Sequence, residues 1–281
     1  MNAIVFHPRC LEYGAPGHPE SPERLQRALE FLRAQGVYRF REPEPASEED
    51  LLRVHTPEHL ERVKNREFYD PDSPRYENIY EYARLSAGGA LLAMRERGFS
   101  LMRPPGHHAG PQRVAGFCYF NNLAVAVKAS GKKTLIVDID GHHGDGTQAI
   151  FLGDPSVVFL SLHSSPNYPG TGLHHEQNCL NYPLPFRCGE EVYLRTLEQA
   201  LTAVDREGIE QLAISAGFDT YERDPLASLG LTTQSYRRLG QLLAELELPT
   251  FAVLEGGYDP EALGPNIHAF LQGLWGGHGG T

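Results

Sequence analysis

Histidine is the residue of this chain best suited to proton transfer and metal binding, and six of its thirteen histidines stand in adjacent pairs. The pairs are His107-His108, His142-His143 and His174-His175. Glycines and aspartates surround the first two pairs but not the third. We therefore expect metal or acid–base chemistry at the first two pairs and a solvated loop at the third.

One segment has the residue types of a metal site. Asp138, Asp140 and His142 alternate along the chain, and residues two apart in an extended segment project to the same side. Two carboxylates that close need a cation between them, because their repulsion would otherwise raise one pKa sharply. Oxygen and nitrogen ligands without cysteine suit Zn²⁺, Fe²⁺, Mn²⁺ or Co²⁺ in an open site. A loop of solvated turn residues is the alternative interpretation.

Two other positions have residue types that are used in catalysis. His107-His108 follows Arg-Pro-Pro-Gly, in a chain with many aspartates that could orient an imidazole. From these residues alone, general acid–base catalysis and an ordinary structural role are equally open. Tyr258 follows Glu-Gly-Gly, and glycines on its approach suit a mobile phenol at a reacting centre. Simple packing is the alternative for this tyrosine.

Short apolar runs precede the polar clusters and are typical of buried strands. We expect strands at 2–7, 100–103, 134–139, 157–162, 212–215 and 250–254. Helix starts are indicated at Ser21-Pro22, at Ser47 with Asp50 and at Thr56-Pro57, and helical periodicity at 76–97, 193–204, 236–246 and 267–274. This alternation predicts one α/β domain over residues 1–281, a three-layer sandwich around a mostly parallel sheet. Ligands of such sheets bind beyond the carboxyl ends of the strands, where the clusters lie.

Composition excludes several classes of protein. The chain has 281 residues, of which 41% are hydrophobic and 22% are charged, as in ordinary globular proteins. Its net charge of −11 argues against binding to nucleic-acid phosphates. The apolar runs are too short for a membrane span and the start has no secretory pattern, so we expect a cytoplasmic protein. The four cysteines form no Cys-x-x-Cys, which argues against a disulfide framework and a cysteine zinc site.

Five motifs together resemble the zinc-dependent histone deacetylase family of the arginase–deacetylase superfamily, which includes bacterial histone deacetylase-like amidohydrolases. The motifs are RPPGHHAG, DIDGHHGDGTQ, YPGTG, SAGFD and EGGY, in the family's order. The resemblance implies an arginase/deacetylase-like fold and hydrolysis of an acyl amide, above all acetyl, on a primary amine such as acetyl-lysine. Three alternatives are an acetylpolyamine or other small N-acetyl amine amidohydrolase, a ureohydrolase with two metal ions, and a non-catalytic sensor of acylated ligands.

The resemblance also implies a cofactor and partners. It places one Zn²⁺ ion on Asp140, His142 and Asp219, with Fe²⁺ or Co²⁺ as substitutes and K⁺ or Na⁺ as a structural ion. The expected partner is an acylated lysine or a small acylated amine, and neither nucleic acid nor membrane is expected. Homo-oligomerisation is left open.

The same family pattern implies a catalytic role at five positions. His108 is expected to act as general base and then as general acid, with Asp145 behind it. His107 is expected to be an electrostatic partner, with Asp138 behind it. Tyr258 is expected to stabilise the oxyanion with its hydroxyl group.

The substrate side of the pattern is matched less closely. Gly116, Phe117 and Tyr168 are expected to form a narrow tunnel for a linear acyl-amine chain. Ser228 stands where our alignment places the gatekeeper glutamate of a polyamine-selective branch. The loop at 173–180 is shorter than usual in the family and has no glycine. These departures leave the expected chemistry intact and concern the substrate.

Overall fold

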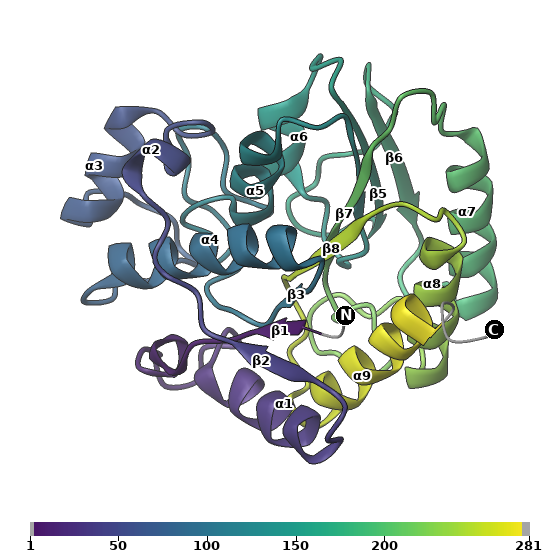
Figure 1. The fold of residues 1–281 in the computed structure, drawn as a ribbon, viewed down its shortest axis with the longest axis horizontal. Helices are drawn as coiled ribbons and strands as arrows, with labels where there is room; N and C mark the ends of the chain where they lie inside the picture. The colour runs from purple at the N-terminus through teal and green to yellow at the C-terminus, as the bar shows by residue number, and fades with distance from the viewer. Residues whose placement is uncertain (1–2, 277–281) are drawn as a thin grey trace.

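An eight-stranded parallel sheet forms the centre of the structure, a computed structural model that describes residues 3–276 (Figure 1). The strands lie in the order β2-β1-β3-β8-β7-β4-β5-β6. Their bounds are β1 Ala3–Val5, β2 Arg39–Arg41, β3 Phe99–Ser100, β4 Thr134–Asp138, β5 Val157–Ser164, β6 Cys179–Leu184, β7 Gln211–Ala216 and β8 Thr250–Leu254. All seven pairings between these strands are parallel, which confirms the predicted α/β fold.

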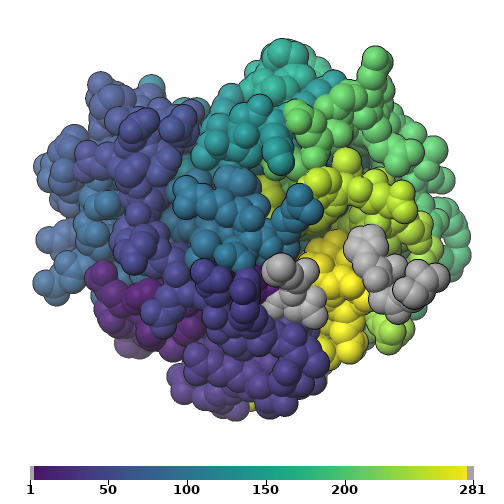
Figure 2. All heavy atoms as spheres, in the orientation of Figure 1, coloured from purple at the N-terminus to yellow at the C-terminus, as the bar shows by residue number. Residues whose placement is uncertain are grey.

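Helices cover both faces of this sheet and complete the three layers. Their bounds are η1 Pro8–Leu11, α1 Pro22–Ala34, α2 Glu48–Leu51, α3 Pro57–Asn65, α4 Ile79–Glu96, α5 Asn122–Ser130, α6 Asp145–Phe151, α7 Glu190–Ala203, α8 Thr233–Ala244 and α9 Pro260–Gly276. Helices α4 and α5 lie on one face, and α1, α7, α8 and α9 lie on the other (Figure 1). The space-filling view shows the side chains of α1 and α9 packed against each other (Figure 2).

Two apolar clusters fill the spaces between the layers. In β4, Leu135 and Val137 belong to the cluster under α1, α7, α8 and α9, whereas Ile136 belongs to the cluster under α4 and α5. Because both faces of the strand are covered, its sequence is a continuous apolar run. None of the helices between residues 3 and 276 has the length and the apolar composition that crossing a membrane requires.

Most predicted elements are present, with different ends. Strand β8 has the predicted bounds, and α2 begins with the predicted capping box of Ser47 and Asp50. The strand predicted at 100–103 is only Phe99–Ser100 long. Its early end is consistent with the following prolines, which have no N–H to donate to a neighbouring strand. Asn2 of the first predicted strand lies outside the described residues, and the sequence analysis did not predict α5, α6, β2 and β6.

Candidate active site

The polar clusters lie together at the carboxyl ends of five consecutive strands of the sheet, β3, β8, β7, β4 and β5. His107-His108 follows β3, Tyr258 follows β8, Asp219 follows β7, Asp140 and His142 follow β4, and Tyr168 follows β5. This is the edge at which ligands of open α/β sheets bind. The sheet therefore brings together residues that lie far apart in the chain, from His107 to Tyr258.

Three buried side chains form a group that could hold a metal ion. Ligand atoms of Asp140, His142 and Asp219 lie within 4.8 Å of one another, the one such group found among residues 3–276. Nδ1 of His142 is 3.1 Å from Oδ1 of Asp140 and 2.8 Å from Oδ2 of Asp219. This Oδ2 is buried and accepts no well-aligned hydrogen bond. Two buried carboxylates and an imidazole with an unsatisfied oxygen fit one divalent cation.

The backbone approaches these ligands closely at two glycines. A Cβ atom at Gly217 would lie 2.1 Å from Oδ2 of Asp140, and one at Gly256 would lie 2.6 Å from the same oxygen. The N–H of Gly256 donates to this oxygen at 2.8 Å. A side chain at either position would therefore displace Asp140.

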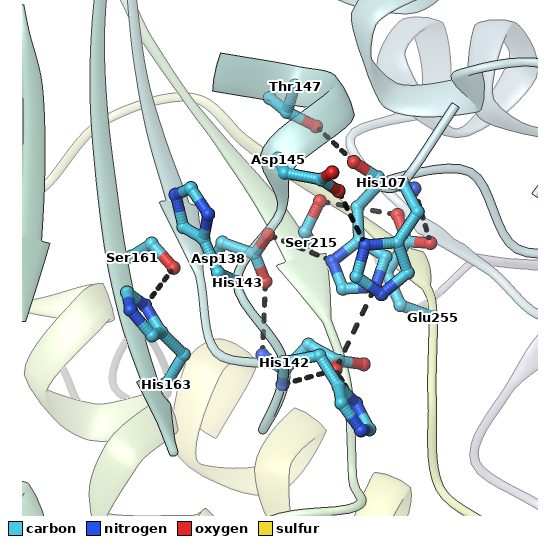
Figure 3. A network of polar contacts seen from close by, with 12 residues as sticks. His107, Asp138, His142, His143, Asp145, Thr147, Ser161, His163, Ser215 and Glu255 are labelled. Atoms are coloured by element: carbon cyan, nitrogen blue, oxygen red, sulfur yellow. Dashed lines mark hydrogen bonds and ion pairs between the residues drawn. The ribbon is translucent and has the colours of Figure 1, made fainter. Parts of the chain in front are cut away.

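Asp138 does not join the metal-binding group that its spacing with Asp140 and His142 suggested, but it lies behind His107 as the family resemblance implies. Its Oδ2 lies 3.1 Å from Nδ1 of His107 instead (Figure 3). Burial disfavours the charged ring, but the carboxylates of Asp140 and Asp138 raise the pKa of His107 well above its usual range. These carboxylates favour the imidazolium form of His107, whose main-chain N–H donates to Oε2 of Glu255 at 3.1 Å.

His108 has the opposite charge state. Its Nδ1 lies 2.8 Å from Oδ1 of Asp145, yet burial and the positive His107 lower the pKa of His108 to about 3. Burial alone would raise the pKa of Asp145, but His108 and the ion pair with Arg113 hold it at about 2. The ring of His108 is therefore neutral, which is the protonation state that a general base requires.

A cavity of about 230 Å³ opens over His108 and His142. Its lining consists of Asp72, His108, Gly116, Phe117, His142, Asn167, Tyr168, Leu226 and Tyr258. The ring of Tyr168 lies 5.0 Å from that of His108, and the ring of Phe117 lies 5.8 Å from that of Tyr258. The aromatic walls predicted from the sequence therefore line the same cavity as the polar groups.

The turn at Gly116 and Phe117 forms one wall of this cavity. Gly116 has φ +52°, and a Cβ atom there would lie 2.5 Å from Cδ2 of His108. Phe117 also has a positive φ, 71°, which is uncommon for an aromatic residue. Its N–H donates to Oγ of Ser73 at 3.0 Å, which holds this conformation.

Tyr258 lines the cavity beside Arg24. The guanidinium carbon of Arg24 is 4.7 Å from the centre of the tyrosine ring, and the N–H of Tyr258 donates to Oδ2 of Asp224 at 2.7 Å. Burial raises the pKa of Tyr258 well above its usual range. The phenol therefore stays protonated and can donate a hydrogen bond.

Several histidines singled out in the sequence lie elsewhere. His143 is buried and its Nδ1 is hydrogen-bonded to Thr171, outside the cavity lining. His174 and His175 are exposed, as expected for a solvated loop. Ser228 is fully buried and does not line the cavity, whereas Leu226 does. The alignment of Ser228 with the gatekeeper position stays a prediction.

Two kinds of residue near the site were not predicted from the sequence. Asp72, Asn167 and Leu226 line the cavity but carry no motif that would select them. Glu255 and Asp224 hold main-chain N–H groups of His107 and Tyr258. Glu255 is part of the EGGY motif and Asp224 follows the SAGFD motif, so position in the chain was the only signal for either residue.

Comparison with known proteins identifies the family. Residues 18–274 match the histone deacetylase domain. The chain belongs to the histone deacetylase family. It is 38% identical to a probable deacetylase of Archaeoglobus fulgidus, over 94% of this chain and 83% of that protein. It is 36% identical to acetylpolyamine amidohydrolase 1 of Pseudomonas aeruginosa, over 74% of this chain and 66% of that protein.

Two solved structures have the same fold. The acetylpolyamine aminohydrolase of Burkholderia pseudomallei superposes with a TM-score of 0.92 at 28% identity, over 98% of both chains. The HD domain of HDA15 superposes with a TM-score of 0.90 at 32% identity, over 99% of this chain and 90% of that one. The chain is thus a hydrolase of the deacetylase or amidohydrolase type, which confirms the family, fold and enzyme class predicted from the sequence.

Proposed function

We propose that this deacetylase removes acetyl groups from a primary amine on a flexible chain, with acetyl-lysine as the leading substrate class. The observation that carries the proposal is the convergence on one cavity of the metal-binding group, a neutral His108 and a protonated Tyr258. An amide is a poor electrophile with a poor leaving group. Its hydrolysis needs an activated water, a polarised carbonyl and a proton for the departing nitrogen.

Asp140, His142 and Asp219 would hold the metal ion, and we propose Zn²⁺, with Fe²⁺ or Co²⁺ as substitutes. Their donor set of two carboxylates and one imidazole leaves room for further ligands, as catalytic sites require. When bound, such an ion polarises a carbonyl and lowers the pKa of water from about 15.7 to about 7.

In this proposal His108 moves the proton. The hydrogen bond of its Nδ1 to Asp145 directs Nε2 away from that carboxylate, and the ring lines the cavity. His108 takes a proton from the attacking water and later gives it to the leaving amine. His107 keeps its own proton and supplies positive charge beside the reacting centre.

Tyr258 then stabilises the negative charge that develops on the carbonyl oxygen. Its protonated phenol lines the cavity, so it is in place to donate a hydrogen bond before the substrate arrives. Phe117 and Tyr168 enclose the chain that carries the amine. These rings offer apolar contact to a methylene chain and exclude bulk water from the amide.

A small acetylated polyamine is the second candidate substrate. The exposed carboxylate of Asp72 stands at the cavity mouth, where a second amino group of a polyamine would be attracted. Similarity to the Pseudomonas and Burkholderia acetylpolyamine enzymes adds support. The acetyl-lysine class is supported by similarity to the HD domain of HDA15.

A substrate panel tests the proposal. Purified protein is incubated with acetyl-lysine peptides, acetylpolyamines, small N-acetyl amines and guanidino compounds, with and without a chelator. We expect chelator-sensitive release of acetate from at least one N-acetyl amine. Hydrolysis of guanidino compounds would favour a ureohydrolase instead. Zinc binding without hydrolysis of any compound would favour the non-catalytic sensor.

A further inference from the structure

Both oxygens of the Asp224 carboxylate accept main-chain hydrogen bonds. Oδ2 accepts the N–H of Tyr258 at 2.7 Å, and Oδ1 accepts the N–H of Leu226 at 2.9 Å. Asp224 is only 5% exposed, so water does not compete strongly for these donors. Nothing in the proposed proton transfer or metal binding uses this buried acid.

The two donors belong to different walls of the cavity. Leu226 lies in the segment after β7, and Tyr258 lies in the segment after β8. One carboxylate therefore joins the Leu226 wall to the backbone of Tyr258. The connection is independent of side-chain contacts between the two residues.

Asp224 is itself held firmly in its loop. Its N–H donates to the carbonyl of Tyr221 at 3.0 Å, and Tyr221 pairs with Leu231 in an isolated β-bridge. The loop is thus closed on both sides of Asp224. A carboxylate fixed in this way can transmit the position of the loop to Tyr258.

We propose that Asp224 is a positioning residue that sets the place of the Tyr258 phenol relative to the Leu226 wall of the cavity. The inference rests on the proposed function, in which Tyr258 donates to the substrate oxygen. Asp224 affects turnover only by holding Tyr258 in position. The acid does not touch the substrate.

Both acceptor oxygens of Asp224 are required for this role. Asn at this position would keep the shape but turn an NH₂ group toward one of the two N–H donors. One main-chain donor would then lose its acceptor, and the Tyr258 backbone or the Leu226 backbone would shift.

A double-mutant cycle with Asp224→Asn and Tyr258→Phe tests the proposal. We expect Asp224→Asn to lower kcat about tenfold to a hundredfold when Tyr258 is present, because small displacements of catalytic groups have effects of this size. In the Tyr258→Phe background the same change should cost less than about threefold, because the two residues act as one unit. Metal content is measured on every variant and should stay unchanged.

Asp154→Asn is the matched control. Asp154 also accepts hydrogen bonds in a turn, from the N–H of Ser156 at 2.9 Å and from its hydroxyl at 2.6 Å, but it lies outside the cavity lining. Its variant should keep the kcat of the parent. Equal losses of kcat in Asp154→Asn and Asp224→Asn would show that the loss of any such turn contact lowers activity, and would overturn the proposal.

Equal losses from Asp224→Asn in both backgrounds would also overturn it, since Asp224 would then act independently of Tyr258. Full turnover by Tyr258→Phe alone would instead refute the proposed role of Tyr258. If Asp224→Asn does not fold, the cycle uses Asp224→Glu, which keeps both acceptors but displaces them by one methylene. Its loss of kcat should again disappear in the Tyr258→Phe background, and a persistent loss would contradict the proposal.

Discussion

Two adjacent histidines of this site differ in charge because their surroundings differ. His107 faces two carboxylates, Asp138 and Asp140, which favour the imidazolium. His108 faces the positive ring of His107, and its own partner Asp145 is shared with Arg113. The surroundings thus favour the protonated form of His107 and the neutral form of His108.

Removal of the Tyr258 hydroxyl tests the oxyanion role. We predict that Tyr258→Phe lowers kcat about a hundredfold or more, since an oxyanion donor contributes about 2.7–4 kcal/mol. Metal content should not change, because Tyr258 is not in the Asp140–His142–Asp219 group. Steady-state kinetics with metal analysis checks this, and unchanged turnover would remove Tyr258 from the mechanism.

Arg113 should influence the pH dependence of catalysis. It neutralises part of the charge on Asp145, and Asp145 favours the protonated form of His108. Arg113→Ala should therefore raise the pKa of His108 and move the acid limb of kcat/KM to higher pH. The Arg113 side chain is 55% exposed, so we expect a shift below about one pH unit. Arg113→Lys should largely restore the parent profile, and a limb that moves to lower pH would contradict the account.

Motifs in the sequence predict the deep part of the site better than its mouth. His107, His142 and Tyr258 follow strands with glycine-rich turns, so residue type and position in the chain indicate the same chemistry. Asp72 and Leu226 reach the cavity from separate loops. Their approach depends on how the whole chain closes, which local patterns do not encode.

At the scale of elements, buried strands were predictable because both of their faces are covered. The apolar run at 135–137 forms the centre of β4, whose bounds Thr134–Asp138 are close to the predicted 134–139. Helix α6 was missed because it begins with Asp145 and glycine, inside a motif that suggests a loop. Its start places Asp145 behind His108, so the unpredicted helix supplies a candidate catalytic partner.

A buried histidine between α2 and α3 fixes the loop around His108. Nε2 of His55 accepts the N–H of Asn121 at 2.9 Å, so Nδ1 carries the proton that Gly110 accepts at 3.0 Å. Asn121 in turn donates to the carbonyl of Ala109, next to His108. Protonation of His55 at Nε2 would break the hydrogen bond from the Asn121 N–H, because that nitrogen could no longer accept.

The stability of this arrangement should depend on pH. Burial and the neighbouring His59 lower the pKa of His55 to about 3 in the folded state, below its usual value of 6.5. The unfolded chain therefore takes up this proton first, and the stabilising effect of neutral His55 is lost as pH falls from 6.5 toward 3.

We predict that His55→Phe lowers the free energy of unfolding by about 1–3 kcal/mol at pH 7, because Asn121 loses its acceptor. The difference from the parent protein should narrow at pH 5, since the variant has no His55 to protonate. Urea unfolding at the two pH values measures both effects. An equal difference at the two pH values would contradict the titration of His55.

At the scale of the whole molecule, several of the negatively charged residues lie inside. Asp138, Asp140, Asp219 and Glu255 are each no more than 1% exposed, at the end of the sheet where five loops meet. The charge of −11 therefore says less about partners than composition alone suggests. Part of this charge comes from the carboxylates that the fold gathers at the carboxyl end of the sheet.

This concentration predicts a stability that depends on metal. A divalent ion that binds only the folded state stabilises it by about 2.7 kcal/mol at a hundredfold excess over Kd. A chelator should therefore lower the Tm and added Zn²⁺ should restore it. Asp219→Asn should respond much less, since it lacks one carboxylate of the group. Thermal unfolding of both proteins, with and without Zn²⁺, checks this.

The most direct test of the account is a titration of metal-free protein with Zn²⁺ while acetate release from an acetyl-lysine peptide and from an acetylpolyamine is measured. The account predicts that turnover of at least one substrate rises with bound metal and saturates at about one ion per chain, as expected from the single group of Asp140, His142 and Asp219 found among residues 3–276. A requirement for two ions per chain, or no acetate release at any metal content, would contradict it.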